Sequence, residues 1–240
     1  MLGFWNRKKS IIDCGILEGC ADNHSHILYG VDDGVKTEED SIKILRFLEE
    51  AGVYAVWLTP HIMEDVPNTT EGLKARFADF CMEYDGPIKL HLAAEYMMDA
   101  LYLDRLHKKD LLLHGGDRVL IETSTTTPPV DLWNIVEETK NCGYTPLLAH
   151  PERYGYLTPK DYDRLHDMGV LFQLNISSLA GVYGDVAQQR AKSLLAKEYY
   201  CMWGSDCHRY RAIEAQYVSK VLTKDVIEAL DRIKYGILDA

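Results

Sequence analysis

Short apolar runs recur along the chain and alternate with segments whose apolar residues lie three or four positions apart. The runs are rich in β-branched and aromatic residues and are bounded by turn-forming residues, which is typical of strands buried on both faces of a parallel sheet. The first strand ends at residues 22–26, and further strands are expected at 53–59, 88–94, 118–121, 144–149, 170–176 and 199–204.

The amphipathic segments predict helices between these strands. Thr37 is a suitable N-cap, because acidic residues follow it in the first turn and an apolar stripe begins at Ile42. About seven strands that alternate with helices predict an α/β fold with parallel strands. The expected helices cover residues 37–52, about 70–84, part of 99–113, 128–142 (opened by Pro128-Pro129), 159–168 and 185–197.

The chain of 240 residues shows no obvious domain boundary. It contains no Pro/Gly/Ser-rich linker, no low-complexity run and no repeat of solenoid period, so one domain is the simpler interpretation. A formal net charge of −11 argues against nucleic acid as the main partner, because affinity for phosphate backbones comes from clustered Lys and Arg. The charge has a second interpretation, in which bound cations neutralise several carboxylates.

The cysteines and the N-terminal residues indicate the compartment. Six cysteines without a Cys-x-x-Cys pair and without a signal peptide predict reduced thiols in a cytoplasmic protein. In residues 1–9 the apolar positions precede the basic ones, the reverse of a secretory signal, and we expect a solvated chain end. No apolar run approaches the roughly 20 residues that span a bilayer, so an integral membrane protein is not expected.

Metal-ligand side chains follow almost every expected strand. His24 and His26 lie two positions apart in an extended run, so they point to the same side. Asp33 follows in a turn between Gly30 and Gly34, where glycine lets the chain double back. Sites in parallel β/α folds gather at the carboxyl ends of the strands, and we expect the donors to meet there. The candidates are His24, His26, Asp33, His61, Glu95, Glu122, His150, Asp206 and His208, whereas His91, His107, His114 and His166 are interpreted as structural or surface residues.

Nine imidazole and carboxylate donors are too many for one ion and suit a cluster of two or three. The mixed donor set favours Mn, Fe or Zn over Mg or Ca. Two such ions about 4 Å apart lower the pKa of a bridging water and stabilise the attacking and leaving oxygens at phosphorus, so hydrolysis of a phosphate ester is the natural reaction. Arg153, just after His150, has the bidentate fork that binds phosphate oxygens, and the alternative for it is a helix cap or surface ion pair.

These motifs closely resemble the PHP (polymerase and histidinol phosphatase) superfamily and, within it, the bacterial manganese-dependent protein tyrosine phosphatases of capsule and exopolysaccharide loci. The resemblance runs from about residue 20 to 235. It is carried by Asp22-Asn23-His24-Ser25-His26-Ile27-Leu28, Val31-Asp32-Asp33-Gly34, Thr59-Pro60-His61, Ala94-Glu95, Ile121-Glu122, Ala149-His150-Pro151-Glu152-Arg153-Tyr154 and Ser205-Asp206-Cys207-His208.

The resemblance implies a distorted (β/α)7 TIM-like barrel, the PHP fold, over residues 21–240, preceded by an N-terminal extension of residues 1–20. It implies three divalent metal ions, most naturally Mn, at the C-terminal ends of the strands. The implied ligands are His24, His26, Glu95 and Asp206 for the first ion, Glu95, Glu122 and His150 for the second, and Asp33, His61 and His208 for the third.

The same resemblance implies catalytic roles for Arg153, Asp206 and His208, with Arg153 binding the phosphate. The implied substrate is phosphotyrosine on a bacterial tyrosine autokinase that controls polysaccharide export, hydrolysed by a metal-bridging hydroxide without a phosphoenzyme. Family members usually carry Arg-Pro-Pro after the last metal motif, and this chain has Arg209-Tyr210-Arg211-Ala212, so either Arg209 or Arg211 is a candidate for the second phosphate contact.

Three other functions were weighed. A small-molecule PHP phosphatase, such as one that acts on histidinol phosphate, would have the same metal residues. Cysteine-based tyrosine phosphatase chemistry needs an arginine five residues after the thiolate, and none of the six cysteines has one. A non-enzymatic binding protein would lack ligands, whereas all nine are present. The general acid and the oligomeric state stay open, and an oligomer is compatible with the sequence.

Overall fold

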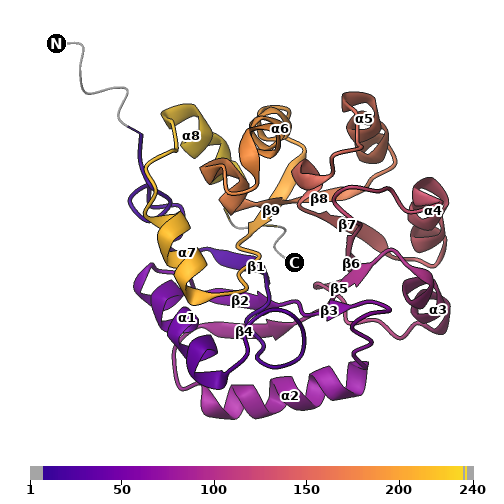
Figure 1. The fold of residues 1–240 in the computed structure, drawn as a ribbon, viewed down its shortest axis with the longest axis horizontal. Coiled ribbons are helices and arrows are strands. Elements are labelled where there is room, and N and C mark those ends of the chain that lie inside the picture. Colours follow the sequence, from indigo (N-terminus) through magenta and orange to yellow (C-terminus); the bar gives the residue numbers. More distant parts are fainter. Residues whose placement is uncertain (1–7, 235, 237–240) are drawn as a thin grey trace.

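The computed structural model describes residues 8–234 and residue 236. Parallel strands form a central ring, and the helices surround it on the outside (Figure 1). The solvated end expected at residues 1–9 lies, apart from Lys8 and Lys9, outside the described residues.

Every strand pair in the ring is parallel, as predicted. A three-stranded sheet has the order β1 (Ala21–Ser25), β2 (Ala55–Leu58), β4 (Lys89–Leu92). A six-stranded sheet has the order β3 (His61–Ile62), β5 (Glu95–Met97), β6 (Arg118–Glu122), β7 (Thr145–Ala149), β8 (Leu171–Asn175), β9 (Tyr200–Gly204).

Two strand positions of the ring are each divided into two short strands. β3 continues β2 after residues 59–60, and β5 continues β4 after residues 93–94. Beyond β9, the Asp206 amide donates to the His24 carbonyl at 2.8 Å, and the His26 amide donates to the Cys207 carbonyl at 3.0 Å. These bonds join the end of β1 to the end of β9, so the strands occupy seven positions around a distorted (β/α)7 barrel, as expected.

The division of the third expected strand corrects one detail of the prediction. The run 88–94 was expected to be one strand that ends just before Glu95, but β4 ends at Leu92 and Glu95 begins the separate strand β5. The amide of Ala93 still donates to Leu58, and that of Glu95 donates to Pro60, both of the neighbouring strand position. The break therefore bends the chain without opening the barrel, and it turns the Glu95 carboxylate toward the axis.

The helices agree with the sequence pattern except at one start. The helix expected from Pro128 begins at Leu132, because Asp131 is the N-cap and the two prolines lie in the preceding loop. No helix was predicted beyond residue 204, where the structure has α7 and α8. The helices are α1 (Glu38–Glu50), α2 (Thr70–Glu83), α3 (Ala100–Lys108), α4 (Leu132–Asn141), α5 (Pro159–Asp167), α6 (Gly184–Ala196), α7 (Tyr210–Tyr217) and α8 (Lys224–Arg232), with short 3-10 helices η1 (Pro151–Arg153) and η2 (Ile176–Ala180).

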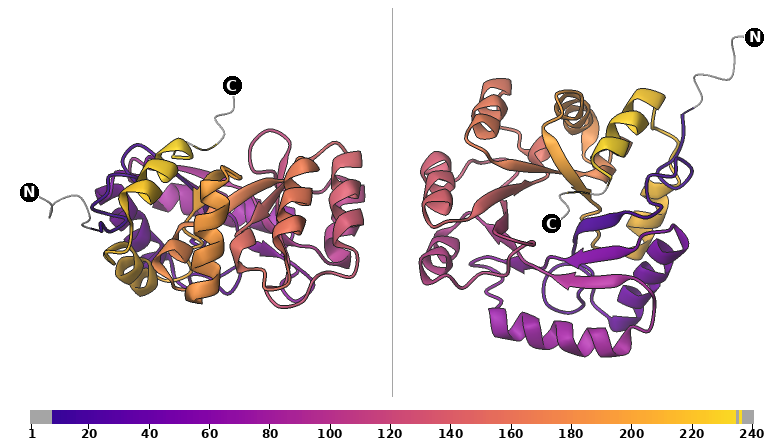
Figure 2. Two further views of the ribbon diagram at one scale, coloured as in Figure 1. Left: turned by 90° about the horizontal axis from the view of Figure 1, so that it is seen from above. Right: turned by 180° about the vertical axis from the view of Figure 1, so that it is seen from behind.

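Residues 8–20 pack against the last helices of the barrel (Figure 2). Lys9 exchanges backbone hydrogen bonds of 2.9 Å with Leu222, in the connection between α7 and α8. Ile11 and Leu17 are fully or almost fully buried in the main hydrophobic core. The division at residue 20 stays a prediction, but the described part of the extension belongs to the same hydrophobic core as the barrel.

Candidate metal centre

The carboxyl ends of the strands bring the nine predicted donors together. Within each of four groups, one donor atom from every residue lies within 4.8 Å of the others. The groups are His24, His26 and Asp206; His24, Glu95 and His150; His61, Glu95 and Glu122; and His26, Asp33, His61 and His208.

Glu95 lies at the centre of the cluster. Its Oε2 is 3.3 Å from Nε2 of both His24 and His26, and 3.1 Å from Nδ1 of His61, while Oε1 is 3.0 Å from Nε2 of His150. Oε2 is buried and accepts no hydrogen bond of normal geometry from the described residues. A buried carboxylate oxygen surrounded by ring nitrogens fits a ligand shared between metal ions better than it fits a hydrogen-bond network.

The tautomers of His24 and His26 support the same interpretation. Nδ1 of His24 donates to Oε1 of Gln173 at 2.8 Å, and Nδ1 of His26 donates to Oδ2 of Asp32 at 2.8 Å. Gln173 is oriented because its amide nitrogen donates to the Leu174 carbonyl. The two Nε2 atoms are therefore unprotonated in the neutral side chains and lie 3.1 Å apart. Their lone pairs repel each other at this distance unless a proton or a metal ion lies beside them.

Charges around the cluster shift its pKa values in opposite directions. Burial and the charge of His61 lower the pKa of His26, but its contacts with Asp32 and Glu95 outweigh both and raise it to about 9. Burial raises the pKa of Glu95, but the surrounding histidines hold it well below its usual range. The same charges raise the pKa values of His24 and His61 and lower that of Asp206, whereas burial lowers the pKa of His208. The inner part of the metal-free cluster thus favours ionised Glu95 and Asp206 beside protonated histidines, which is how a site prepared for cations behaves.

Unusual backbone conformations aim several of these side chains. His150 and Asp206 have φ of 34° and 52°, in the left-handed region that β-rich strand ends seldom enter. At Gly34, a Cβ would collide with the carbonyl oxygen of His26 and lie 2.5 Å from its Cβ, so only glycine lets this loop pass so close. Such strained positions collect at functional sites, where the surrounding contacts hold them in place.

The mouth of the cluster is a pocket of about 320 Å³ that is lined by two of the three predicted phosphate-binding arginines. Asp33 stands at its rim with a side chain 71% exposed, while Arg153 reaches inward and Nη1 donates to Oδ2 of Asp206 at 2.7 Å. Arg209 lines the same pocket, and Arg211 is exposed on α7 and is not among the lining residues. The structure thus brings Arg153 and Arg209 to the mouth of the cluster.

Several residues that support the cluster were missed by the sequence analysis. Asp32 and Gln173 orient the two first histidines, and Asn175 donates to Asp206 at 2.9 Å. Glu152 is fully buried and accepts hydrogen bonds from the Asn175 amide, Ser178 and Tyr200. Asp32 lies in the turn already singled out around Asp33, six positions from His26, whereas Asn175 ends β8 and its partner Asp206 lies 31 positions further along the chain.

The histidines outside the cluster behave as predicted. His114 is buried and its Nε2 bonds the carbonyl of Asn23 at 2.8 Å, and both His114 and His91 stack on Trp57. His166 stacks on Tyr199 at the surface. Cys207 is buried between two of the candidate ligands, and burial raises the pKa of its thiol far above the usual value, so it is an unreactive thiol.

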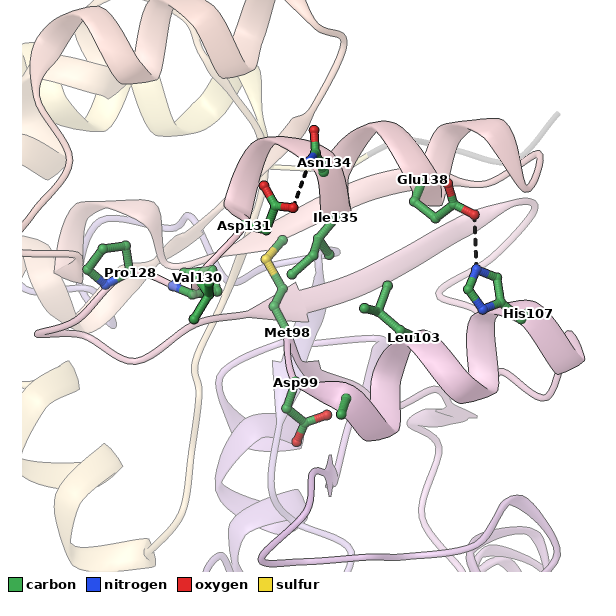
Figure 3. Close-up of a pocket in the computed structure, with 12 residues that line it drawn as sticks. Met98, Asp99, Leu103, His107, Pro128, Val130, Asp131, Asn134, Ile135 and Glu138 are labelled. Atoms are coloured by element: carbon green, nitrogen blue, oxygen red, sulfur yellow. Dashed lines mark hydrogen bonds and ion pairs between the residues drawn. The ribbon is translucent and has the colours of Figure 1, made fainter.

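A larger cavity lies on the outside of the barrel, between α3 and α4 (Figure 3). It measures about 590 Å³ and is lined largely by apolar side chains, including Met98, Leu103, Val130 and Ile135. Its ionisable lining residues are Asp99, Asp131 and the His107–Glu138 pair, and none of the nine cluster residues lines it. The cavity therefore has a separate environment from the cluster.

Among the described residues, no helix has the length and apolar content needed to cross a membrane. The fold and the donor cluster define the chain as a β/α-barrel protein with a group of metal-type donors at the carboxyl ends of its strands. More specifically, the chain belongs to the CpsB/CapC family of capsular polysaccharide synthesis, whose family model matches residues 20–230.

Relatives in bacteria match most of the chain. Tyrosine-protein phosphatase CpsB of Streptococcus pneumoniae is 29% identical over 201 residues, which cover 78% of this chain and 82% of the relative. Tyrosine-protein phosphatase YwqE of Bacillus subtilis is 26% identical over 213 residues, covering 85% and 84%. The predicted resemblance to bacterial tyrosine phosphatases of capsule loci is confirmed at the level of the family.

Solved structures give the same fold. The crystal structures of B. subtilis YwqE and S. pneumoniae CpsB, described as metal-dependent tyrosine phosphatases, include a chain with a TM-score of 0.75 and 24% identity, covering 88% of this chain and 86% of that one. A phosphotriesterase homology protein from Escherichia coli, solved with phosphate in its active site, has a TM-score of 0.53 and 12% identity, covering 88% and 91%. These matches confirm the barrel.

Proposed function

We propose that the protein is a metal-dependent protein tyrosine phosphatase. The observation that carries this proposal is a cluster of nine metal-type donors whose outer members line one pocket together with Arg153 and Arg209. The three donors in that lining are Asp33, Asp206 and His208. The relatives named as tyrosine-protein phosphatases in S. pneumoniae and B. subtilis support it. The substrate would be phosphotyrosine on a bacterial tyrosine autokinase that regulates capsule or exopolysaccharide synthesis.

The proposal includes three divalent ions, Mn by preference, with Fe or Zn as alternatives. His24, His26, Glu95 and Asp206 would hold the first, Glu95, Glu122 and His150 the second, and Asp33, His61 and His208 the third. Three of the donor groups resemble these sets, including the four-residue group with Asp33 at the rim. When bound, the ions would supply the Lewis acidity that activates water and neutralises the charge of the phosphate.

The protein's own residues would bind and orient the ester. Arg153 places a guanidinium at the inner wall of the pocket and Arg209 a second one at its edge, and both suit a dianionic phosphate. Asp206 and His208 would act as metal ligands that also line the pocket, and Asp206 holds Arg153. The buried Cys207 thiol, which also lines the pocket, would not act as the nucleophile, because its raised pKa keeps it protonated.

The mouth of the pocket favours an aryl phosphate on a polypeptide over a small amine-bearing phosphate such as histidinol phosphate. Tyr183 lines the pocket and, like its neighbours Val182 and Val186, is an exposed apolar side chain. An exposed apolar surface beside the pocket suits a phosphate that is carried on a larger partner. The alternative function, a small-molecule PHP phosphatase, would use the same donors.

The deciding experiment compares two substrates on one protein. Protein stripped with a chelator and then restored with Mn is assayed with a phosphotyrosine peptide and with histidinol phosphate. We expect peptide turnover that disappears on stripping and returns with metal. Preference for histidinol phosphate would move the protein to the alternative function, and turnover of neither substrate would favour a binding protein that retains the cluster.

The setting of the enzyme belongs to the same proposal. A cytoplasmic location is supported by six cysteines that are all free thiols, and the autokinase substrate is supported by the CpsB relatives. We also propose residues 21–240 as the catalytic domain. Oligomer formation and the absence of nucleic acid as a partner stay predictions.

A further inference from the structure

Tyr183 lines the pocket beside Arg153 but is neither a metal-ligand candidate nor a phosphate-binding candidate. It lies just after η2, at the carboxyl end of β8, and it is 37% exposed. The guanidinium carbon of Arg153 lies 4.3 Å from the centre of its ring. This distance is within the range of a cation–π interaction, which fixes the plane of a guanidinium group.

The hydroxyl of Tyr183 connects back to the metal ligands. The side-chain amide of Asn175 donates one hydrogen bond to this hydroxyl at 3.1 Å and another to Oδ2 of Asp206 at 2.9 Å. Arg153 donates to the same Oδ2 at 2.7 Å. Tyr183, Asn175, Asp206 and Arg153 therefore form a closed ring of contacts, which we call the arginine clamp.

The two oxygens of Asp206 divide their partners. Oδ1 faces the ring nitrogens of His24, His26 and His208 at 3.4–3.6 Å, whereas Oδ2 receives Arg153 and Asn175. One carboxylate thus ties the guanidinium to the cluster without giving up its metal-facing oxygen. Asp206 takes one of the five N–H groups of Arg153, so the others can reach a phosphate.

We propose that Tyr183 is a positioning residue that holds Arg153 for the phosphoryl group of the substrate. Its ring packs against the guanidinium, and its hydroxyl, through Asn175, fixes the carboxylate that accepts from the same guanidinium. A long arginine side chain otherwise loses conformational freedom when it binds, and holding it in advance lowers that cost. The inference rests on the proposed function because it places the phosphate at this pocket.

The experiment compares Tyr183→Leu with Tyr183→Phe in metal-loaded protein. Binding of inorganic phosphate is measured by calorimetry, and hydrolysis of p-nitrophenyl phosphate is measured alongside. We expect Tyr183→Leu to weaken phosphate binding and raise KM by about tenfold, since it removes the cation–π contact. Tyr183→Phe keeps the ring and loses the hydroxyl, so we expect a smaller loss of about threefold.

Two further variants separate positioning from a general structural effect. In protein that carries Arg153→Ala, adding Tyr183→Leu should change phosphate binding by less than about twofold, because Tyr183 acts through the arginine. The matched control is Trp133→Leu, which removes another aromatic ring stacked on an arginine, Arg164 at 3.8 Å, on outer helices. This control should leave phosphate binding unchanged.

The outcomes distinguish the clamp from the proposed function. Turnover with unchanged phosphate binding in Tyr183→Leu would overturn the clamp and leave the function intact. Phosphate binding that depends on Tyr183 in a protein without turnover would support the clamp and overturn the function. Loss of aryl phosphate turnover with normal affinity for inorganic phosphate would mean that Tyr183 contacts the substrate ring, which would also overturn its role in positioning Arg153. Loss of bound metal from Tyr183→Leu would overturn that role too. Failure of the unaltered protein to bind phosphate would do the same.

Discussion

Within the described residues, metal-type donors converge in two regions, and the two differ in what surrounds them. The central cluster gathers nine donors, most of them buried, whereas His107, Glu138 and Cys142 meet at the outer surface of α3 and α4. Nε2 of His107 is 2.9 Å from Glu138, and their side chains are 57% and 43% exposed (Figure 3). Distance between donors alone does not separate the two regions.

The two regions differ in the hydrogen bonds that orient their donor side chains. In the cluster, His24 and His26 each donate Nδ1–H to a fixed acceptor, and Asp206 is held by Asn175 and Arg153. Solvent screens the outer pair, which is an ordinary surface ion pair worth little to stability. The comparison teaches that a metal site is recognised by the residues that orient its ligands as much as by the ligands themselves.

The largest expected effect comes from removing a central donor. Asp206→Ala or His150→Ala should lower turnover of the metal-loaded protein by about 1,000-fold or more, because each ligand contributes several kcal/mol of transition-state stabilisation through the bound ions. Steady-state kinetics with an aryl phosphate measures the effect, and far-UV circular dichroism checks that the barrel is folded. Turnover equal to that of the unaltered protein would remove the cluster from the mechanism.

A smaller effect is expected from removing support while keeping every ligand. Asp32→Asn weakens the acceptor that holds Nδ1 of His26 and the amides of Gly34 and His61. Metal affinity should fall by about 10- to 100-fold, as for other residues that orient metal-bound histidines, and competition with a chelator measures it. Asp163→Asn, at an exposed carboxylate paired with Lys197, is the matched control and should keep full affinity. Equal affinity in both variants would mean that support of His26 is unimportant.

The pH dependence should differ between the metal-free and metal-loaded protein. The pKa of His26 in the folded metal-free chain is raised from 6.5 to about 9. A raised pKa stabilises the fold fully below pH 6.5, and this contribution is lost as the pH rises from 6.5 through 9. Metal ions need unprotonated nitrogens and compete with these protons. The melting temperature of the metal-free protein should therefore fall as the pH rises through this window, while the increase in melting temperature on adding Mn should grow. Thermal denaturation at several pH values measures both quantities. An increase on adding Mn that becomes smaller with rising pH would contradict the prediction.

Much of the central cluster could be predicted from sequence because of its periodicity. His24 and His26 share a face by strand alternation, and parallel strands bring His61, Glu122 and His150 to one end of the barrel. The supporting residues could not be predicted in this way. Gln173 contacts His24 across 149 positions of sequence, and Asn175 reaches Asp206 across 31. Such pairs depend on the register between β8, β1 and the end of β9, which local patterns do not specify.

The parts of the fold that escaped prediction have similar causes. The division of the third expected strand at residues 93–94 depends on where the neighbouring strand bends, since the amides of both Ala93 and Glu95 donate to it. Helix α4 starts at Leu132 rather than Pro128, because the proline signal gives a favourable backbone angle but no contact that fixes the first turn. Local signals thus predict that an element exists, and tertiary contacts determine where it begins.

The smallest expected effect tests the outer region. His107→Ala should leave the metal content and turnover unchanged and alter the free energy of unfolding by no more than about 0.5 kcal/mol, because it removes one exposed ion pair. Metal analysis after dialysis against Mn or Zn, together with thermal denaturation, measures both quantities. Cys142→Ser is the companion variant and should behave in the same way. Loss of a bound ion in either variant would show that three surface donors bind a metal without residues that orient them, and the contrast with the cluster would then rest on burial alone.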